Sequence, residues 1–233
     1  EVGVNEDLIK KCFTIIGHGG RQTKHSWFEK GKERSGSIHR ILGDKYTEIF
    51  FGNQFVKKLC DEIIKDYEDN KPNWKTGVVH HKGNSLHINK ESKDSTDLHV
   101  SPYCEDEPII TYREQLSKMI KLYEKKYPML SCYETYNVYE WFNIQKYKAK
   151  GGFKRWHCER NSKSLSSRVL VFATYLYNIK NGGTEFKYLN TTVPSKKGLT
   201  VIFPTDFTHT HRSEICNQEK MLLTGWLGFN NEL

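Results

Sequence analysis

The second half of the chain constrains the fold most, because from about residue 133 it is a succession of short apolar runs. RVLVFATYLYNI at residues 168–179, GGTEFKYL, GLTVIFP and MLLTGWLGF each have the length and composition of a β-strand. Clusters of Gly and Pro separate these runs and mark turns. The pattern predicts a mainly antiparallel sheet or a sandwich of two sheets.

Two helical stripes precede these strands. One begins at Asn53, and Asn-Lys-Pro at residues 70–72 ends it; its apolar residues recur at helical spacing at Phe55, Leu59, Ile63, Ile64 and Tyr67. The other continues to Tyr127 and stops at Pro128, and the capping-box sequence TYRE at residues 111–114 predicts its start. We therefore predict an α+β fold in which the helices cover one face of the sheet.

The length and composition favour a single domain. The chain has 233 residues, 36% hydrophobic and 13% aromatic, which is enough for one sizeable core. We expect one domain over residues 1–233, with an irregular arm at 1–40, helical and strand support at 53–128 and the catalytic core at 133–233. We expect residues 93–100, KDSTDLHV, to form an edge strand that could line a groove.

Cysteine usage and hydropathy suggest a cytoplasmic protein without a membrane span. No apolar run approaches the length of a transmembrane helix. The six cysteines form neither CxxC nor a zinc-ribbon spacing, which is typical of reduced thiols in a cytosol.

The segment RWHCER at residues 155–160 carries the first sign of chemistry. In a strand, His157 and Glu159 would point to the same face, and an imidazole beside a carboxylate suits a divalent transition metal. Taken alone, a solvated pair on a sheet surface is the better interpretation. Cys158 would face the other side of the strand, and we assign it no role.

Further along the chain, PTDFTHTHRSE supplies His209 and His211, and Lys220 follows nine residues after His211. Two histidines and one carboxylate on one face of a metal leave open positions, as in non-heme Fe(II) oxygenases. A 2-oxo acid and O2 can occupy those positions. A dicarboxylic co-substrate also needs a cation, which Lys220 could provide, and Tyr147 could add a hydrogen bond.

From about Tyr139 to Phe229 the chain resembles the 2-oxoglutarate/Fe(II) oxygenase family in its prolyl-4-hydroxylase-like branch. The features that match in order are Tyr147, His157-x-Glu159, Tyr175-Leu176, Gly182-Gly183, the GLTVIFP run, His211, Lys220 and Trp226. The resemblance implies a double-stranded β-helix, or jelly-roll, core with supporting N-terminal helices.

The resemblance also implies roles for individual residues. His157, Glu159 and His211 correspond to the metal ligands, and Lys220 corresponds to the basic residue that binds the distal carboxylate of 2-oxoglutarate. Aromatic residues of the cofactor pocket correspond to Tyr147, Tyr175 and Trp226. Plain structural roles remain the alternatives: Lys220 as a surface lysine, and the two tyrosines as ordinary core residues. The cofactors implied are Fe(II), 2-oxoglutarate and O2, with ascorbate as a further reductant.

Two positions depart from the family pattern or are ambiguous in it. Most of the family has Asp where this chain has Glu159, so the backbone must compensate for one additional methylene. His209 could replace His211 as the second histidine ligand. The spacing to Lys220 and Trp226 favours His211, which would leave His209 beside the metal site or at the pocket rim.

The implied reaction is hydroxylation of a C–H bond on a peptidyl, prolyl-like side chain. An alternative is a nucleic-acid oxygenase or demethylase, because residues 142–168 contain eight Lys or Arg and one acid, Glu159, in a chain of net charge +8. That class usually binds 2-oxoglutarate through arginine, whereas this chain has Lys220. A second alternative is a non-enzymatic jelly-roll that binds a metal or another ligand.

Overall fold

The structure, a computed structural model, describes residues 38–44, 47–52, 54–80 and 86–229. Within these ranges the α-helices are α2 (Gln54–Asp69) and α3 (Glu107–Lys126). Short 3-10 helices span Lys71–Asn73, Pro128–Cys132, Lys163–Leu165 and Phe207–His209. Most of the arm expected at residues 1–40 lies outside the described residues, but Ile38 already belongs to a strand, so the last three residues of that segment are not irregular.

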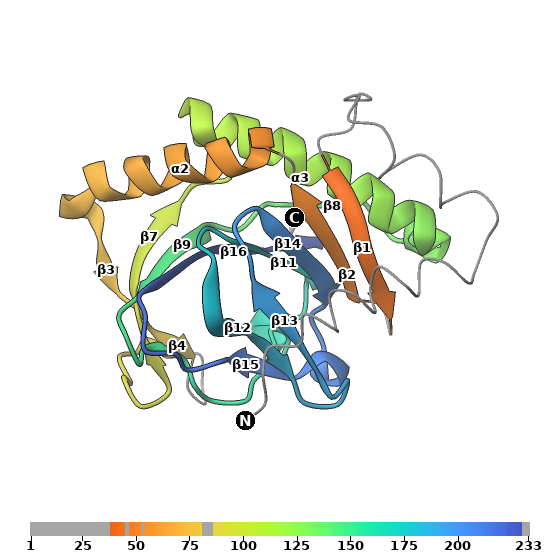
Figure 1. Cartoon of the computed structure of the whole chain (residues 1–233). Helices are drawn as coiled ribbons and strands as arrows, with labels where there is room; N and C mark the ends of the chain where they lie inside the picture. The colour runs from red at the N-terminus through yellow and green to blue at the C-terminus, as the bar shows by residue number, and fades with distance from the viewer. Residues whose placement is uncertain (1–37, 45–46, 53, 81–85, 230–233) are drawn as a thin grey trace.

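A large antiparallel sheet forms the centre of the protein (Figure 1). Its strands, in spatial order, are β1 (Ile38–Asp44), β2 (Thr47–Gly52), β14 (Leu199–Pro204), β11 (Arg168–Tyr175), β16 (Lys220–Phe229), β9 (Phe142–Tyr147), β7 (Thr96–Val100) and β3 (Lys75–Thr76), with β8 (Tyr136–Asn137) also paired to β16. The last part of the chain, β16, thus lies between two strands that precede it in sequence.

Helices α2 and α3 lie across one face of the large sheet (Figure 1). Alternate residues of the strands face them: Ile144 of β9, Phe172 of β11 and Leu223 of β16 are fully buried in one core with Ile63 of α2. Each such side chain contributes about 1.5–3 kcal/mol through burial. The predicted stripes of both helices are therefore core residues, as far as their side chains are described.

A small antiparallel sheet lies opposite the helices, on the other side of the large sheet (Figure 1). It consists of β13 (Thr191–Ser195), β12 (Ile179–Phe186) and β15 (His211–Ser213). Gly183 of β12 allows a close approach, because a Cβ at this position would lie 1.9 Å from the carbonyl oxygen of Val193. Two pairs of short strands complete the described part: β4 (Val79–His80) with β5 (Leu86–His87), and β6 (Lys93–Asp94) with β10 (Gly152–Phe153).

The antiparallel sheets and the two helices confirm the α+β prediction, but three local predictions were wrong. Helix α3 begins at Glu107, with Pro108 in its first turn, and not at the capping-box sequence that starts at Thr111. Strand β7 is not an edge strand, because it pairs with both β9 and β3. Residues 155–160 form no strand, and His157 makes only an isolated β-bridge.

Candidate metal and co-substrate site

A cavity of ≈ 1230 Å³ lies on the face of the large sheet that is turned away from the helices. The strand alternation that sends Ile144 towards the helices sends Asn143, Gln145 and Tyr147 of β9 into the cavity wall. The small sheet contributes Thr184 and His211 to the same wall. The cavity therefore lies between the two sheets.

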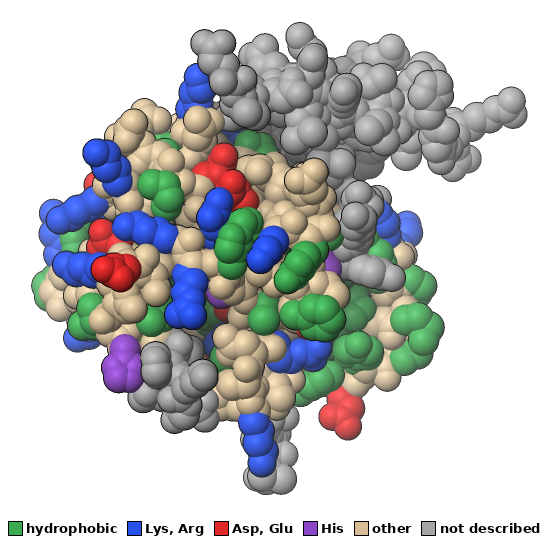
Figure 2. Space-filling view, turned by 90° about the horizontal axis from the view of Figure 1, so that it is seen from below, with side chains coloured by type: hydrophobic (Ala, Val, Ile, Leu, Met, Phe, Trp, Pro, Cys, Tyr) green, Lys and Arg blue, Asp and Glu red, His purple; other side chains and the backbone are tan. Residues whose placement is uncertain are grey.

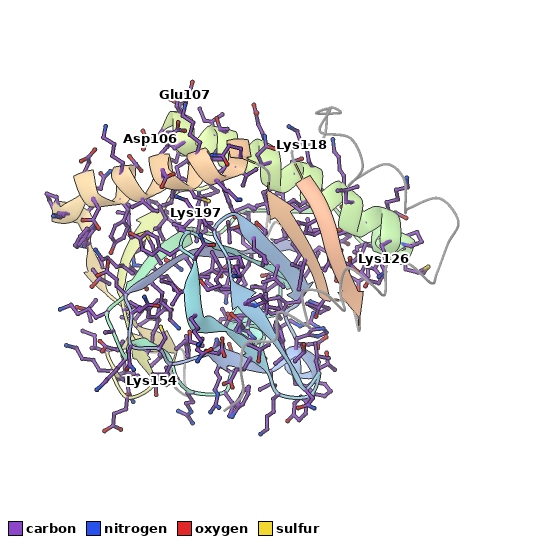
Figure 3. The ribbon with its side chains drawn as sticks, viewed as in Figure 1. Asp106, Glu107, Lys118, Lys126, Lys154 and Lys197 are labelled. Atoms are coloured by element: carbon purple, nitrogen blue, oxygen red, sulfur yellow. The ribbon has the colours of Figure 1, made fainter. Side chains whose placement is uncertain are left out.

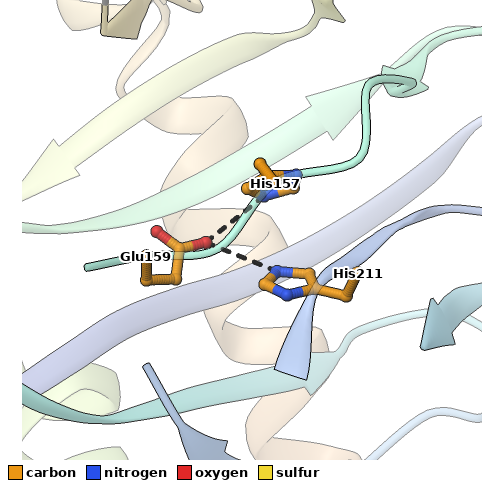
Figure 4. Close-up of side chains that lie close together, drawn as sticks. All are labelled: His157, Glu159 and His211. Atoms are coloured by element: carbon orange, nitrogen blue, oxygen red, sulfur yellow. Dashed lines mark ion pairs between the residues drawn. The ribbon is translucent and has the colours of Figure 1, made fainter. Parts of the chain in front are cut away.

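Three side chains converge in the cavity wall, as Figure 4 shows. Nε2 of His157 lies 3.3 Å and Nε2 of His211 lies 3.4 Å from the same oxygen, Oε1 of Glu159. One potential ligand atom from each residue lies within 4.8 Å of the others. Two imidazole nitrogens and one carboxylate oxygen in this arrangement are a suitable donor set for Fe(II) with open coordination positions.

The backbone brings these residues together although His157 belongs to no strand. His157 and His211 exchange two backbone hydrogen bonds of 3.1 and 2.9 Å, which form an antiparallel bridge. The Glu159 N–H donates to the carbonyl oxygen of Thr205 at 3.0 Å, just after β14. The segment is thus held by its partners on both sides, and the convergence of His157 and Glu159 does not depend on strand periodicity.

Backbone carbonyls orient both imidazole rings. Nδ1 of His157 lies 2.9 Å from the carbonyl oxygen of Arg155, and Nδ1 of His211 lies 2.8 Å from that of His209. A carbonyl only accepts hydrogen bonds, so each Nδ1 carries its proton and Nε2 is the ring nitrogen that faces Glu159. The ring of Phe153 stacks on His157, with 3.6 Å between ring centroids, and fixes its plane.

The ionisation states also suit a cation. Burial, and then the neighbouring His211, lower the pKa of His157 from its usual value, which favours the neutral imidazole. Burial alone would raise the pKa of Glu159, but hydrogen bonds from His157 and His211 outweigh it and hold that pKa well below its usual range. The group therefore presents a carboxylate, and the neutral imidazole of His157 is favoured beside it.

The second oxygen of Glu159 has its own partners. Nε1 of Trp226 donates to Oε2 at 3.0 Å, and the guanidinium of Arg168 lies 3.6 Å from the same atom. Arg168 also stacks over the Trp226 ring, with its Cζ 3.6 Å from the ring centroid. Trp226, expected as a cofactor-binding aromatic, thus contacts the carboxylate of the proposed ligand Glu159.

Sequence reasoning missed Arg168 and its partner Glu140. Both oxygens of the Glu140 carboxylate accept hydrogen bonds from the guanidinium, which fixes the plane of Arg168 beside Glu159. In the sequence, Arg168 was the last cation of the basic run and the first residue of a buried strand. A buried position for an arginine requires an acid partner, and this requirement was the available signal.

Two of the predicted co-substrate residues are neighbours in the large sheet. Lys220 and Tyr147 are register partners in β16 and β9, and Nζ of Lys220 lies 5.6 Å from the Tyr147 ring centroid. Tyr147 lines the cavity and donates to Oε1 of Gln145 at 2.8 Å. Tyr175 donates to Thr184 Oγ1 at 2.6 Å, behind the cavity wall. Burial raises the pKa of both tyrosines, so both are neutral donors.

Lys220 is a buried ammonium that lacks an acid partner within the described residues. Its side chain is 4% exposed, and Nζ donates to the backbone carbonyl of Glu214. Burial lowers its pKa from the usual value for lysine. A buried cation without a carboxylate is costly, which makes this position suited to an anionic ligand.

His209 does not join the group of ligands. Its side chain is buried, its ring lies near Phe203 with 6.1 Å between centroids, and it is not part of the cavity wall. Its contribution to the site is its carbonyl oxygen, which accepts from His211 Nδ1. Cys158, expected to face away, does contribute to the cavity wall.

Known proteins resemble this chain in sequence and in fold. Residues 142–228 match the family model of the 2OG-Fe(II) oxygenase superfamily, so this segment of the chain is similar to that superfamily. Solved structures with a similar fold include prolyl hydroxylases, and at their low sequence identity the likeness is one of fold. The superfamily implies Fe(II) as the metal and 2-oxoglutarate as the co-substrate.

Three solved structures illustrate the similarity. The viral collagen prolyl hydroxylase vCPH from Paramecium Bursaria Chlorella virus-1, in its 2OG complex, is 18% identical with a TM-score of 0.54, over 78% of this chain and 96% of that chain. A Pseudomonas putida prolyl-4-hydroxylase is 14% identical with a TM-score of 0.58, over 74% and 88%. A Trichoplax adhaerens prolyl hydroxylase, in complex with a hypoxia inducible factor peptide fragment, is 13% identical with a TM-score of 0.59, over 78% and 83%.

One comparison found no match, and the helices show no membrane-spanning character. No curated protein matches the chain by sequence. Neither helix of the described part is long and apolar enough to cross a membrane.

Proposed function

We propose that the protein uses Fe(II) and 2-oxoglutarate to hydroxylate a C–H bond of a prolyl-like side chain in a peptide. The observation that carries this proposal is the convergence of His157, Glu159 and His211 in a cavity wall that also contains Tyr147, the strand neighbour of the buried Lys220. The match to the oxygenase superfamily over the same residues supports it.

The metal would be held by Nε2 of His157, Nε2 of His211 and Oε1 of Glu159. When bound, Fe(II) together with 2-oxoglutarate and O2 supplies the oxidant for the C–H bond. The protein's own part is to hold the donors in place. The two carbonyls orient the imidazoles, while Trp226 and Arg168 restrict the Glu159 carboxylate to one free oxygen.

Lys220 would bind the distal carboxylate of 2-oxoglutarate, with Tyr147 and Tyr175 as hydrogen-bond donors to the same ligand. This assignment requires Nζ of Lys220 to exchange its bond to the Glu214 carbonyl for the ligand carboxylate. The exchange is favourable, because a charged acceptor forms a stronger hydrogen bond with an ammonium than a neutral carbonyl does. Lys93 is less suitable, because Asp97 already neutralises it at 2.6 Å.

The fold and the domain organisation support the same assignment. We interpret the large and small sheets as the two walls of a double-stranded β-helix, with α2 and α3 as supporting N-terminal helices. In this interpretation residues 133–233 form the catalytic core and residues 53–128 support it. Apolar side chains of Val171, Ala173 and Phe203 in the cavity wall exclude water from the reaction.

A prolyl-like substrate is proposed because the structural neighbours are prolyl hydroxylases, and one of them is complexed with a peptide. The test is to incubate the protein with Fe(II), 2-oxoglutarate, O2 and ascorbate, and with a set of synthetic proline-containing peptides. We expect succinate release together with a peptide mass increased by one oxygen atom, and neither with the His157→Ala variant. Turnover with methylated oligonucleotides but with no peptide would contradict the proposal.

A further inference from the structure

Four cations lie in the cavity wall or next to residues that line it, and we call Lys154, Arg155, Lys163 and Lys187 the basic rim. The exposed residues of the cavity wall, among them Trp141 and Arg155, mark where the cavity opens. Lys154 lies between Phe153 and Arg155, which both line the cavity.

The other two cations lie next to the same wall. Lys163 directly follows Ser162, a cavity-lining residue, and the Lys187 ammonium lies 5.8 Å from the ring centroid of cavity-lining Trp156. The basic rim is therefore a continuation of the loop that carries His157 and Glu159, together with the end of β12.

None of the rim cations has a carboxylate within 4.0 Å among the residues that the structure describes. Arg168 and Arg212, which also line the cavity, differ in this respect, because Glu140 and Glu185 pair with them. Arg155, Lys163 and Lys187 are exposed, and Lys154 is half-buried. The positive charge of the rim is therefore not neutralised by the described part of the chain.

The acids of the described cavity wall do not compensate for this excess. They are Asp97, paired with Lys93; Glu140, paired with Arg168; and Glu159, held by the two histidines. Figure 2 views the molecule from the side of the small sheet, where Lys and Arg side chains predominate around a hollow. Field lines from such a set of like charges concentrate at the opening and attract anionic ligands.

The side chains at the rim suit a peptide better than a nucleic acid. Single-stranded nucleic acid binds through aromatic side chains on which bases stack, in addition to basic residues. Two aromatic rings lie beside the Lys187 ammonium: Trp156, whose face Arg212 covers with Cζ 4.3 Å from the ring centroid, and the exposed Tyr188. Carboxylate side chains need only accessible cations, which the rim supplies.

We propose that the basic rim binds Asp or Glu side chains that flank the oxidised residue, so that the substrate is an acidic peptide segment. This inference rests on the proposed peptidyl hydroxylase function and specifies its substrate class. Exposed ion pairs are individually weak and sensitive to salt, so the rim selects and steers the substrate, while the metal site performs the reaction.

Two variants with the same change in charge provide the test. Lys163→Glu/Lys187→Glu reverses the charge of two exposed rim residues that are not among the candidate metal ligands. Lys118→Glu/Lys121→Glu reverses two exposed lysines of α3, on the opposite side of the large sheet, where Figure 3 labels Lys118. Thermal unfolding of both variants checks that they are folded.

The turnover measurement uses three peptides with one central proline, flanked by Asp and Glu, by Ser and Gln, or by Lys and Arg. For the wild type we expect the lowest KM with the acidic peptide, by roughly three- to tenfold over the neutral one, and a difference that shrinks as salt is added. The rim variant should lose this preference and the α3 variant should keep it. Equal KM values for acidic and neutral peptides would overturn the proposal while leaving the hydroxylase function intact.

A binding measurement covers the case in which no peptide is oxidised. Fluorescence anisotropy of a labelled Asp/Glu-Gly peptide without proline should show salt-sensitive binding to the wild type and to the α3 variant, and weaker binding to the rim variant. That result without any turnover would contradict the hydroxylase function and support the rim. No difference between the two variants, or binding of a labelled single-stranded oligonucleotide in preference to the acidic peptide, would overturn the rim proposal.

Discussion

Nε1 of Trp226 donates a hydrogen bond of 3.0 Å to Oε2 of Glu159, while both histidines face Oε1 of the same carboxylate. The two oxygens of Glu159 therefore have different partners, and Trp226 determines which of them is free for a metal.

We predict that Trp226→Phe weakens metal binding by about 10–100-fold, the usual effect of losing a hydrogen bond to a ligand. The variant keeps an aromatic ring but loses the N–H donor and part of the indole surface on which Arg168 stacks. Anaerobic titration with Fe(II), or with Co(II) as a spectroscopic substitute, measures the affinity. Trp141→Phe, at an exposed tryptophan, is the matched control. Equal affinities for both variants would show that the indole does not position Glu159.

Glu159→Asp should weaken metal binding by about tenfold, although Asp is the usual residue in the family. In this chain Trp226 and Arg168 are placed to meet the longer side chain, so an aspartate would lose contact with them or with the histidines. The same titration measures this change. A tighter or unchanged metal affinity would indicate that the backbone is already positioned for aspartate.

Lys220→Met should raise the 2-oxoglutarate concentration for half-maximal turnover by more than tenfold, because a buried carboxylate loses a partner worth about 2–5 kcal/mol. The same variant should unfold at a higher temperature in the absence of ligand, since it removes a buried cation without an acid partner. An unchanged requirement for 2-oxoglutarate would place the anchor elsewhere.

The effect of Lys220 on stability should also depend on pH. Burial lowers its pKa in the folded protein below the unfolded value. Between these two pKa values the unfolded chain binds more protons, so the free energy of unfolding of the wild type rises with pH. The stability advantage of Lys220→Met should therefore be full below the folded pKa and shrink as the pH rises from the folded pKa to the unfolded pKa. If the stability difference between Lys220→Met and the wild type stayed constant over this pH range, the lowered pKa of Lys220 would not be its cause.

Variants of the two histidines in the segment THTH, residues 208–211, should have different effects on metal binding. His211→Ala should lose the metal, because it removes a ligand atom. His209→Ala should keep the metal, since its contact with His211 is through the backbone carbonyl, but should lose stability by about 2–5 kcal/mol, as for a truncated core side chain. Metal content and chemical denaturation measure the two effects, and the reverse outcome for metal would exchange the assignments.

Much of the architecture was predictable because the driving patterns are local. β11 is a continuous apolar run because both of its faces are buried. Phe172 packs against the helices, and Ala173 belongs to a second core on the other side of the sheet. The start of α3 was not predictable from the capping box, because Pro108 in the first turn and packing of Ile109 in the core extend the helix towards its N-terminus.

The candidate site was predictable in its ligands and less so in its support. His157 and Glu159 stood out as residue types, but their convergence depends on pairing with His211 and Thr205, which are distant in sequence. Arg168 and Glu140 form their ion pair only because the fold brings the start of β11 beside the residues before β9. Such contacts have no signature in local spacing.

The central claim is that His157, Glu159 and His211 hold Fe(II), to which 2-oxoglutarate binds directly. Adding Fe(II) and 2-oxoglutarate anaerobically to the protein should produce a visible metal-to-ligand charge-transfer band, absent when either is omitted. The account predicts that His157→Ala and His211→Ala abolish this band, while His209→Ala retains it. A band of full strength in His157→Ala would contradict the claim.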